Sequence, residues 1–191
     1  LEISPNNKNF VFKDDKYLLG KSDPKSDSFD VLLYARPDLK KAIIQSNIKI
    51  ISNSAFKQCS QLTSVEIPEN SELTYIGEYA FELTKIRRIY IPKHVKKIDS
   101  NAFFQCSDLE YVQFSKDAEL EIIENDVFTG TNIKGICIPE SVKRIGYSIP
   151  DRLNLHQSRR FIEISEKSTL NLRRTFLGNE NILLMTSKHI K

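Results

Sequence analysis

The stretch IGEYAFELTKIRRIYIP, residues 76–92, changes character within 17 residues. Its first half holds Ala80-Phe81 in a short turn-rich segment. Its second half alternates apolar and other residues, as a strand does, until Pro92 ends it. A unit this short cannot bury its apolar side chains alone, so the fold that it predicts depends on whether the unit recurs along the chain.

Copies of this unit recur in register along the chain. Further copies begin at Ile50, Lys97 and Ile122, and a weaker one, LKKAIIQSNIKII, covers residues 39–51. One column holds isoleucines spaced by 25, 22, 25 and 22 residues, and a column of phenylalanines follows the same alternation. The two columns are Ile51, Ile76, Ile98, Ile123 and Ile145, and Phe56, Phe81, Phe103 and Phe128.

Each copy also contains a strand-like motif, L-x-x-V-x-I, which proline follows at positions 68, 92 and 139. We expect each unit to form one coil of a solenoid, with one short helical or 3-10 turn at Ala-Phe and one short strand at this motif. Stacked coils would place the strands in a parallel sheet and the phenylalanines in an internal ladder. Burial of one phenylalanine contributes roughly 1.5–3 kcal/mol.

Within the motif the named residues should point inward, and the residues between them should form an outward face of the sheet. Tyrosine and arginine are common at interface hot spots, and Arg88, Tyr90 and Tyr111 should meet on adjacent strands. The alternative is that these are solvated strand residues that serve only cross-strand pairing. The predicted protein-binding residues are Ser64, Glu66, Arg87, Arg88, Tyr90, Glu110, Tyr111, Gln113, Lys134 and Cys137, with Thr63 and Gly135 beside them.

The repeat pattern I-x-x-I-x-x-x-A-F-x-x-C-x-x-L-x-x-V-x-I-P resembles the BspA-like leucine-rich repeats, including those of protist surface antigens. The resemblance covers residues 39–147. It implies a leucine-rich-repeat solenoid with a parallel strand sheet on one face and short helical or 3-10 turns and short strands on the other. It further implies a non-enzymatic scaffold for protein recognition or adhesion, and a cell-surface or extracellular location. No signal peptide, anchor or N-x-S/T acceptor is visible in the sequence.

We divide the chain into three parts: an irregular N-terminal coil or hairpin cap at 1–38, the repeats at 39–147 and a basic C-terminal segment at 148–191. In the first part, FVFKDDKYLLG at 10–20 indicates a hairpin with Asp14-Asp15 at its turn. The last part follows no repeat register, but we expect a strand at 161–164 that could continue the sheet, and a helix at 168–177 ended by Gly178. It could be a cap or a detached interaction arm.

The charge is distributed unevenly. Residues 1–142 contain 18 Lys and Arg against 21 Asp and Glu, whereas residues 143–191 contain 10 against 4. Such a basic segment could contact nucleic acid or an anionic membrane, or pack against the acidic repeats. Arg159-Arg160 and Arg173-Arg174 are pairs rather than a long basic run.

The sequence gives no sign of catalysis. It lacks phosphate-binding, dinucleotide-binding and hydrolase motifs, and none of His94, His156 and His189 has metal-ligand spacing. We therefore expect no cofactor and no metal, and an exposed turn position for His94. Cys59 and Cys106 take the place of threonines in the other units. We expect no disulfide between them, because two coils separate their Cα atoms by ~10 Å.

Three classes of function remain open. The first is protein recognition or adhesion through the outward sheet face. The second is an assembly role, in which coil ends or the C-terminal segment join chains into oligomers. The third is a salt-dependent contact of the basic segment with nucleic acid or membrane.

Overall fold

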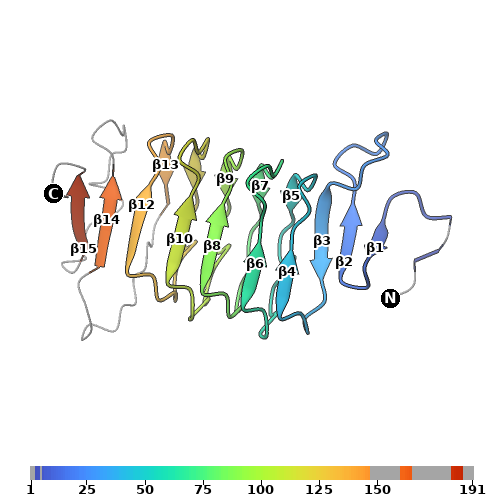
Figure 1. Cartoon of the computed structure of the whole chain (residues 1–191), viewed down its shortest axis with the longest axis horizontal. Coiled ribbons are helices and arrows are strands. Elements are labelled where there is room, and N and C mark those ends of the chain that lie inside the picture. The colour runs from blue at the N-terminus through green and yellow to red at the C-terminus, as the bar shows by residue number, and fades with distance from the viewer. Residues whose placement is uncertain (1–2, 5, 147–159, 165–181, 187–191) are drawn as a thin grey trace.

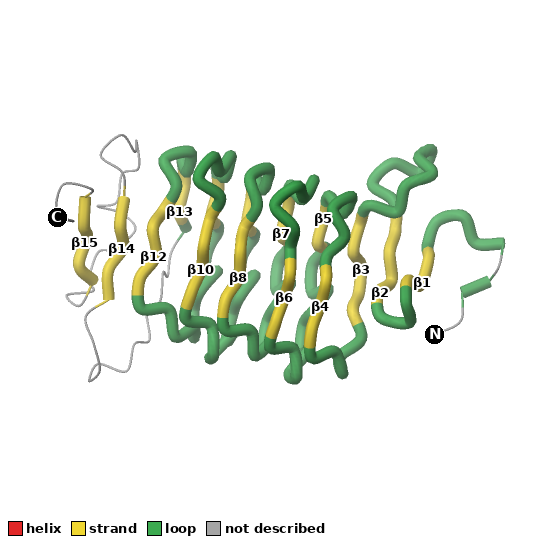
Figure 2. The backbone as a smooth tube through the Cα atoms, viewed as in Figure 1, coloured by secondary structure: helices red, strands yellow, loops and turns green. Residues whose placement is uncertain are grey.

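The computed structural model describes residues 3–4, 6–146, 160–164 and 182–186. The chain winds as a solenoid whose coils stack along one axis from the N-terminal to the C-terminal end (Figure 1). Its described residues form strands and loops, and none of them is helical (Figure 2).

One side of the solenoid carries the strands of the L-x-x-V-x-I motif, which we name the long-strand face. They lie side by side in chain order and point the same way (Figure 1). Hydrogen bonds join them in parallel groups, β4 with β6, β8 with β10, and β12 with β14 and β15. The strands are β4 (Lys41–Ile43), β6 (Ser64–Glu66), β8 (Arg88–Ile91), β10 (Tyr111–Phe114), β12 (Gly135–Ile138), β14 (Arg160–Ile164) and β15 (Ile182–Thr186).

The other side carries a second sheet, the short-strand sheet. After β3 (Val31–Ala35) its parallel members are two residues long: β5 (Ile50–Ile51), β7 (Tyr75–Ile76), β9 (Lys97–Ile98), β11 (Ile122–Ile123) and β13 (Arg144–Ile145). Each isoleucine of the predicted column pairs with the next, from Ile51 through to Ile145. The predicted register is therefore confirmed, and Leu32 of β3 adds a rung ahead of Ile51.

The four phenylalanines form the predicted internal ladder. Neighbouring ring centroids are 5.0, 5.2 and 5.6 Å apart, and the rings lie within 13° of parallel. This separation follows the ~4.8 Å spacing of adjacent parallel strands. All four side chains are at most 1% exposed, so the ladder runs through the centre of the core.

The Ala-Phe segments form successive turns, which the hydrogen bonds and φ values of their backbone explain. In the second full repeat, Ala80, Glu82 and Thr84 each donate a hydrogen bond to the carbonyl three residues earlier, as in a 3-10 turn. The residues between them, Tyr79, Phe81 and Leu83, donate to the next coil instead. Tyr79 and Leu83 take φ values of +55° and +60°, which a continuous helix does not allow. The segment thus bonds within its own coil and to its neighbour at alternate residues.

An N-terminal hairpin covers one end of the stack. Strands β1 (Val11–Lys13) and β2 (Tyr17–Gly20) are antiparallel, and Asp14 and Asp15 have φ of +52° and +51°, as at the centre of a type I′ turn closed by the Lys16 amide and the Lys13 carbonyl. The hairpin expected in this stretch is thus present. β2 continues antiparallel onto β3, and the ring of Tyr17 meets Phe56 edge-on at 6.4 Å. The phenylalanine ladder therefore ends against an aromatic side chain.

The C-terminal segment continues the long-strand face, as expected for its strand at 161–164, but it also shows a repeat spacing that the sequence did not indicate. The strand expected at 161–164 is present as β14, which pairs in parallel with β12, and β15 pairs in parallel with β14. Corresponding residues of β14 and β15 are 22 apart, the shorter repeat length, as Ile162 and Leu184 show. The expected helix at 168–177 lies outside the described residues.

Candidate functional site

The pleat of the long strands separates core residues from surface residues. On β8, Ile89 and Ile91 are buried, whereas Arg88 is exposed and Tyr90 is half-buried. Successive side chains of a strand point to opposite sides, so Arg88 and Tyr90 share the outward side. β12 repeats this arrangement.

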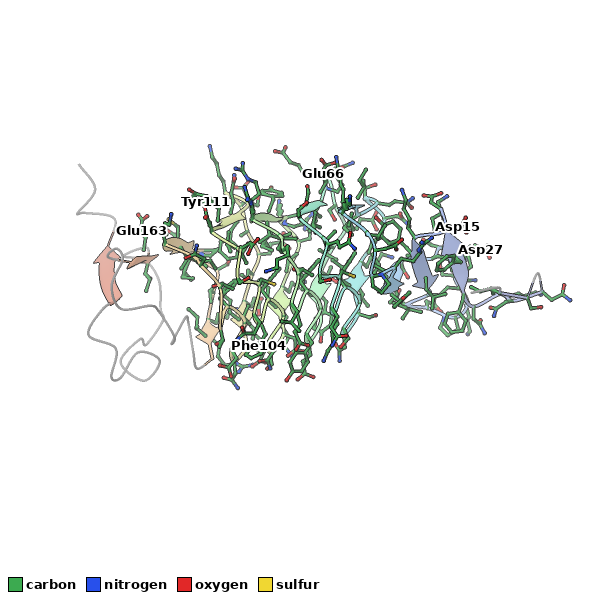
Figure 3. The ribbon with its side chains drawn as sticks, turned by 90° about the horizontal axis from the view of Figure 1, so that it is seen from below. Asp15, Asp27, Glu66, Phe104, Tyr111 and Glu163 are labelled. Atoms are coloured by element: carbon green, nitrogen blue, oxygen red, sulfur yellow. The ribbon has the colours of Figure 1, made fainter. Side chains whose placement is uncertain are left out.

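Five of the predicted residues line one hollow on the long-strand face. The parallel pairing sets Arg88 directly beside Tyr111, and Tyr90 beside Gln113. Glu66 on β6 closes the N-terminal side, and Figure 3 shows Glu66 and Tyr111 projecting from the same side of the molecule. The hollow has a volume of about 610 Å³ and is lined by Val65, Glu66, Ile67, Glu69, Arg88, Ile89, Tyr90, Tyr111 and Gln113.

The two charged residues on the strands of this hollow differ in their ion pairing: Glu66 on β6 is paired, and Arg88 on β8 is not paired with any described residue. The Glu66 carboxylate is 2.5 Å from the Lys41 ammonium, and both groups are about half exposed. Arg88, by contrast, has no ion pair with any residue in the described part of the chain, nor has the neighbouring Arg87. A guanidinium without an ion pair among the described residues therefore belongs to the residue directly beside Tyr111, whose side chain is 56% exposed.

The other five predicted residues lie outside this hollow. Ser64 is the half-buried first residue of β6, and Arg87, Glu110 and Lys134 directly precede β8, β10 and β12. Cys137 is exposed on β12 and lines a second hollow, of about 580 Å³, which it shares with Gln113. Gln113 thus stands between the two hollows.

Cys137 has a partner that the sequence did not indicate. Its Sγ lies 3.0 Å from Oε2 of Glu163 on β14, because Cys137 and Glu163 are direct neighbours in the parallel register. Partial burial, and then the adjacent carboxylate, raise the pKa of the Cys137 thiol to about 11. The thiol is therefore protonated at neutral pH and is a poor nucleophile. Cys59 and Cys106 are buried and free.

A second polar cluster, also missed in the sequence, lies on the short-strand sheet. Tyr75 donates a hydrogen bond of 2.5 Å to Asp99, Lys97 lies between Asp99 and Glu124, and Arg144 binds Glu124 through two nitrogens. Each of these hydrogen bonds and ion pairs joins residues of neighbouring coils or of the same coil. We name these five residues the ionic ladder.

The ionic ladder is internally satisfied. Burial alone would raise the pKa of Asp99, but hydrogen bonds from Tyr75, the Ser100 amide and Lys97 outweigh it and lower that pKa. The two-nitrogen contact with Arg144 lowers the pKa of Glu124. The ladder thus fastens coils to one another rather than offering free groups to a ligand.

The described residues hold no cluster of three or more His, Cys, Asp or Glu side chains suited to a metal ion. His94 lies at an exposed turn, with Nδ1 3.3 Å from a Glu119 carboxylate oxygen. Within the part of the chain that the structure covers, no helix has the length and apolar character needed to span a membrane.

The stacked coils, the repeated strand motif and the internal ladder define a leucine-rich-repeat solenoid. The chain belongs to the BspA type leucine rich repeat family, whose family model matches six copies over residues 30–155. The family match begins before and ends after the repeat boundaries expected from the sequence. Comparison with curated protein sequences gives no significant match.

Two solved structures share this fold. The leucine rich repeat protein TpLRR of T. pallidum aligns with a TM-score of 0.68 at 21% identity, over 91% of this chain and 82% of its own. The pneumococcal vaccine antigen PcpA aligns with a TM-score of 0.60 at 24% identity, over 68% of this chain. This chain spans only 31% of the length of PcpA. At these identities the likeness establishes the fold alone.

Proposed function

We propose that the long-strand face is a protein-recognition surface centred on the hollow between β6, β8 and β10. The observation that carries the proposal is the convergence of Arg88, Tyr90 and Tyr111, from two adjacent strands, on a hollow with a partly apolar floor. Arginine and tyrosine contribute heavily to interface hot spots, because each combines a large contact area with polar groups.

The core of the protein supports this role without taking part in it. The ladder rings and the inward strand residues are buried, so outward residues of the long-strand face can vary with little effect on folding. Repeat solenoids present such extended surfaces to other proteins. The proposed role is that of a scaffold without enzymatic activity, and adhesion at a cell surface belongs to the same proposal.

The test replaces Arg88, Tyr90 and Tyr111 with alanine together and measures capture of binding proteins from an extract. The matched control replaces Lys16, Lys93 and Lys96, which are exposed and line neither of the two hollows. We expect the first variant to lose capture and the control to keep it, with both melting temperatures within about 2 °C of the wild type. Undiminished capture by the first variant would refute the proposal.

Adhesion requires that the protein be accessible from outside the cell. Antibody raised against the folded protein should stain intact cells as strongly as permeabilised cells. Staining that depends on permeabilisation would restrict the proposal to recognition inside the cell.

A further inference from the structure

We infer that the hollow recognises an acidic peptide segment of the partner, with Arg88 receiving a carboxylate. This inference rests on the proposed function, and it adds the chemistry of the ligand. It depends on three features of the hollow: an unpaired cation, two accessible phenol groups and a partly apolar floor.

Other arginines of the chain form ion pairs, and the lack of one at Arg88 among the described residues therefore points to a ligand. Four arginines have described side chains, and two of them are bound to carboxylates: Arg36 to Asp38 at 2.6 Å, and Arg144 to Glu124. Arg87 and Arg88 lie in the part of the chain, residues 1–142, where Asp and Glu outnumber Lys and Arg, yet neither has an ion pair among the described residues. A planar guanidinium that is not used within the fold is suited to bind a carboxylate through two hydrogen bonds.

The local acidic group does not neutralise this cation. Glu66, the lining carboxylate on the adjacent strand β6, is already in contact with Lys41. Glu69, which also lines the hollow, lies in the turn after β6 and forms no ion pair with Arg88. The lining residues on β8 and β10, which include Arg88, Tyr90, Tyr111 and Gln113, contain one positive charge and no negative charge.

The tyrosines and the floor favour a peptide over a free anion. The hydroxyl groups of Tyr90 and Tyr111 have no hydrogen-bond partner among the described residues, so they can bind backbone or side-chain groups of a ligand. The floor between them includes the edges of Val65, Ile67 and Ile89. An extended chain could therefore place a carboxylate at Arg88 and an apolar side chain beside it.

A displayed library of random 12-residue peptides tests the inference. Selection on the wild-type protein should enrich Asp and Glu over the starting library, and the selected peptides should bind Arg88→Gln about tenfold or more weakly, since a charge-assisted contact is lost. Selection on Arg88→Glu should reverse the preference toward Lys and Arg. The Lys93→Gln variant, which removes an exposed charge elsewhere, should behave as the wild type.

The outcomes separate this inference from the function on which it rests. Peptides that lose binding to Tyr90→Ala and Tyr111→Ala but show no acidic enrichment would overturn the inference and leave the recognition face standing. If no selected peptide is sensitive to these three positions, both proposals fail. A single-stranded oligonucleotide that binds through Arg88 more tightly than the selected acidic peptides would also overturn the inference, because tyrosine and arginine can stack on bases.

Discussion

Replacement of Phe81 by alanine should remove a large part of the free energy of unfolding. The Phe81 side chain is 0% exposed and stacks on both Phe56 and Phe103, at 5.0 and 5.2 Å. A buried Phe→Ala change costs about 3–5 kcal/mol, and each aromatic pair adds about 0.5–1.5 kcal/mol beyond the area buried. Domains of this kind are stable by about 5–15 kcal/mol, so the loss should be at least about a fifth of the total.

Urea unfolding followed by far-ultraviolet circular dichroism measures this change, since the chain has no tryptophan. Phe10, which is 44% exposed, provides the control, and Phe10→Ala should stay within about 0.5 kcal/mol of the wild type. A loss of less than about 1 kcal/mol in Phe81→Ala would refute the argument that the ladder stabilises the stack.

A double-mutant cycle tests the ladder more finely. Phe81→Leu and Phe103→Leu remove stacked neighbours while keeping apolar volume, so we expect a coupling of about 0.5–1.5 kcal/mol. Phe56 and Phe128, which are three rungs apart, should give additive losses when changed to leucine. Equal coupling in the two pairs would contradict a ladder of nearest-neighbour contacts.

Three further predictions concern the two sheets. Gly77→Ala should lower the free energy of unfolding by about 1–3 kcal/mol in urea, because its Cβ would lie 2.5 Å from a backbone nitrogen. Gly20→Ala, whose Cβ would meet only flexible side-chain atoms, should cost less, and equal losses would contradict this reasoning. The pKa of Glu124 is lower in the folded protein than in the unfolded chain, so its ionised carboxylate stabilises the fold above the unfolded pKa of about 4.3, and this stabilisation is lost as the pH falls below that value. The unfolding midpoints of Glu124→Gln should therefore depend less on pH between 5 and 3 than those of the wild type. Parallel midpoint curves would exclude that contribution. Cys137 should react slowly with a thiol reagent at pH 8, and Glu163→Gln should raise the rate several-fold by lowering the pKa of the thiol; an unchanged rate would show that the carboxylate has no such effect.

The core was predictable because its residues repeat at fixed positions. Ile76, Phe81 and Ile89 have counterparts in every full repeat, and each such column becomes a column of contacts in the structure. The hairpin was predictable for a different reason, since two adjacent aspartates between strand-like segments favour a tight turn. Both features can be predicted because each depends on residues at one repeated position or within one short stretch of sequence.

The turns and the second sheet were harder to predict. Tyr79 and Leu83 take left-handed φ values without being glycine, so their residue types do not reveal the turns. The isoleucine column marks the position of the two-residue strands, but it does not show which polar side chains pair across them, as Lys97 and Glu124 do in the ionic ladder. β15 was missed because the C-terminal segment lacks the Ala-Phe pair on which the alignment rested.

The candidate hollow was accessible to sequence reasoning only in part. The alternation of β8 and β10 placed Arg88, Tyr90 and Tyr111 on adjacent strands, and the parallel register sets Arg88 beside Tyr111. The ion pair between Lys41 and Glu66 depends on side-chain geometry across two coils, and the alignment did not indicate it. That pair occupies the carboxylate of Glu66, one of the two acidic residues that line the hollow, and so bears on the chemistry of the ligand inferred here.

Site-specific photocrosslinking tests the recognition face most directly. A benzophenone amino acid would be placed at position 111, on the long-strand face, or at position 104, on the opposite side of the solenoid (Figure 3). We predict that irradiation joins the partner to the protein from position 111 and not from position 104. Crosslinking from position 104 alone, or equally from both, would contradict the account.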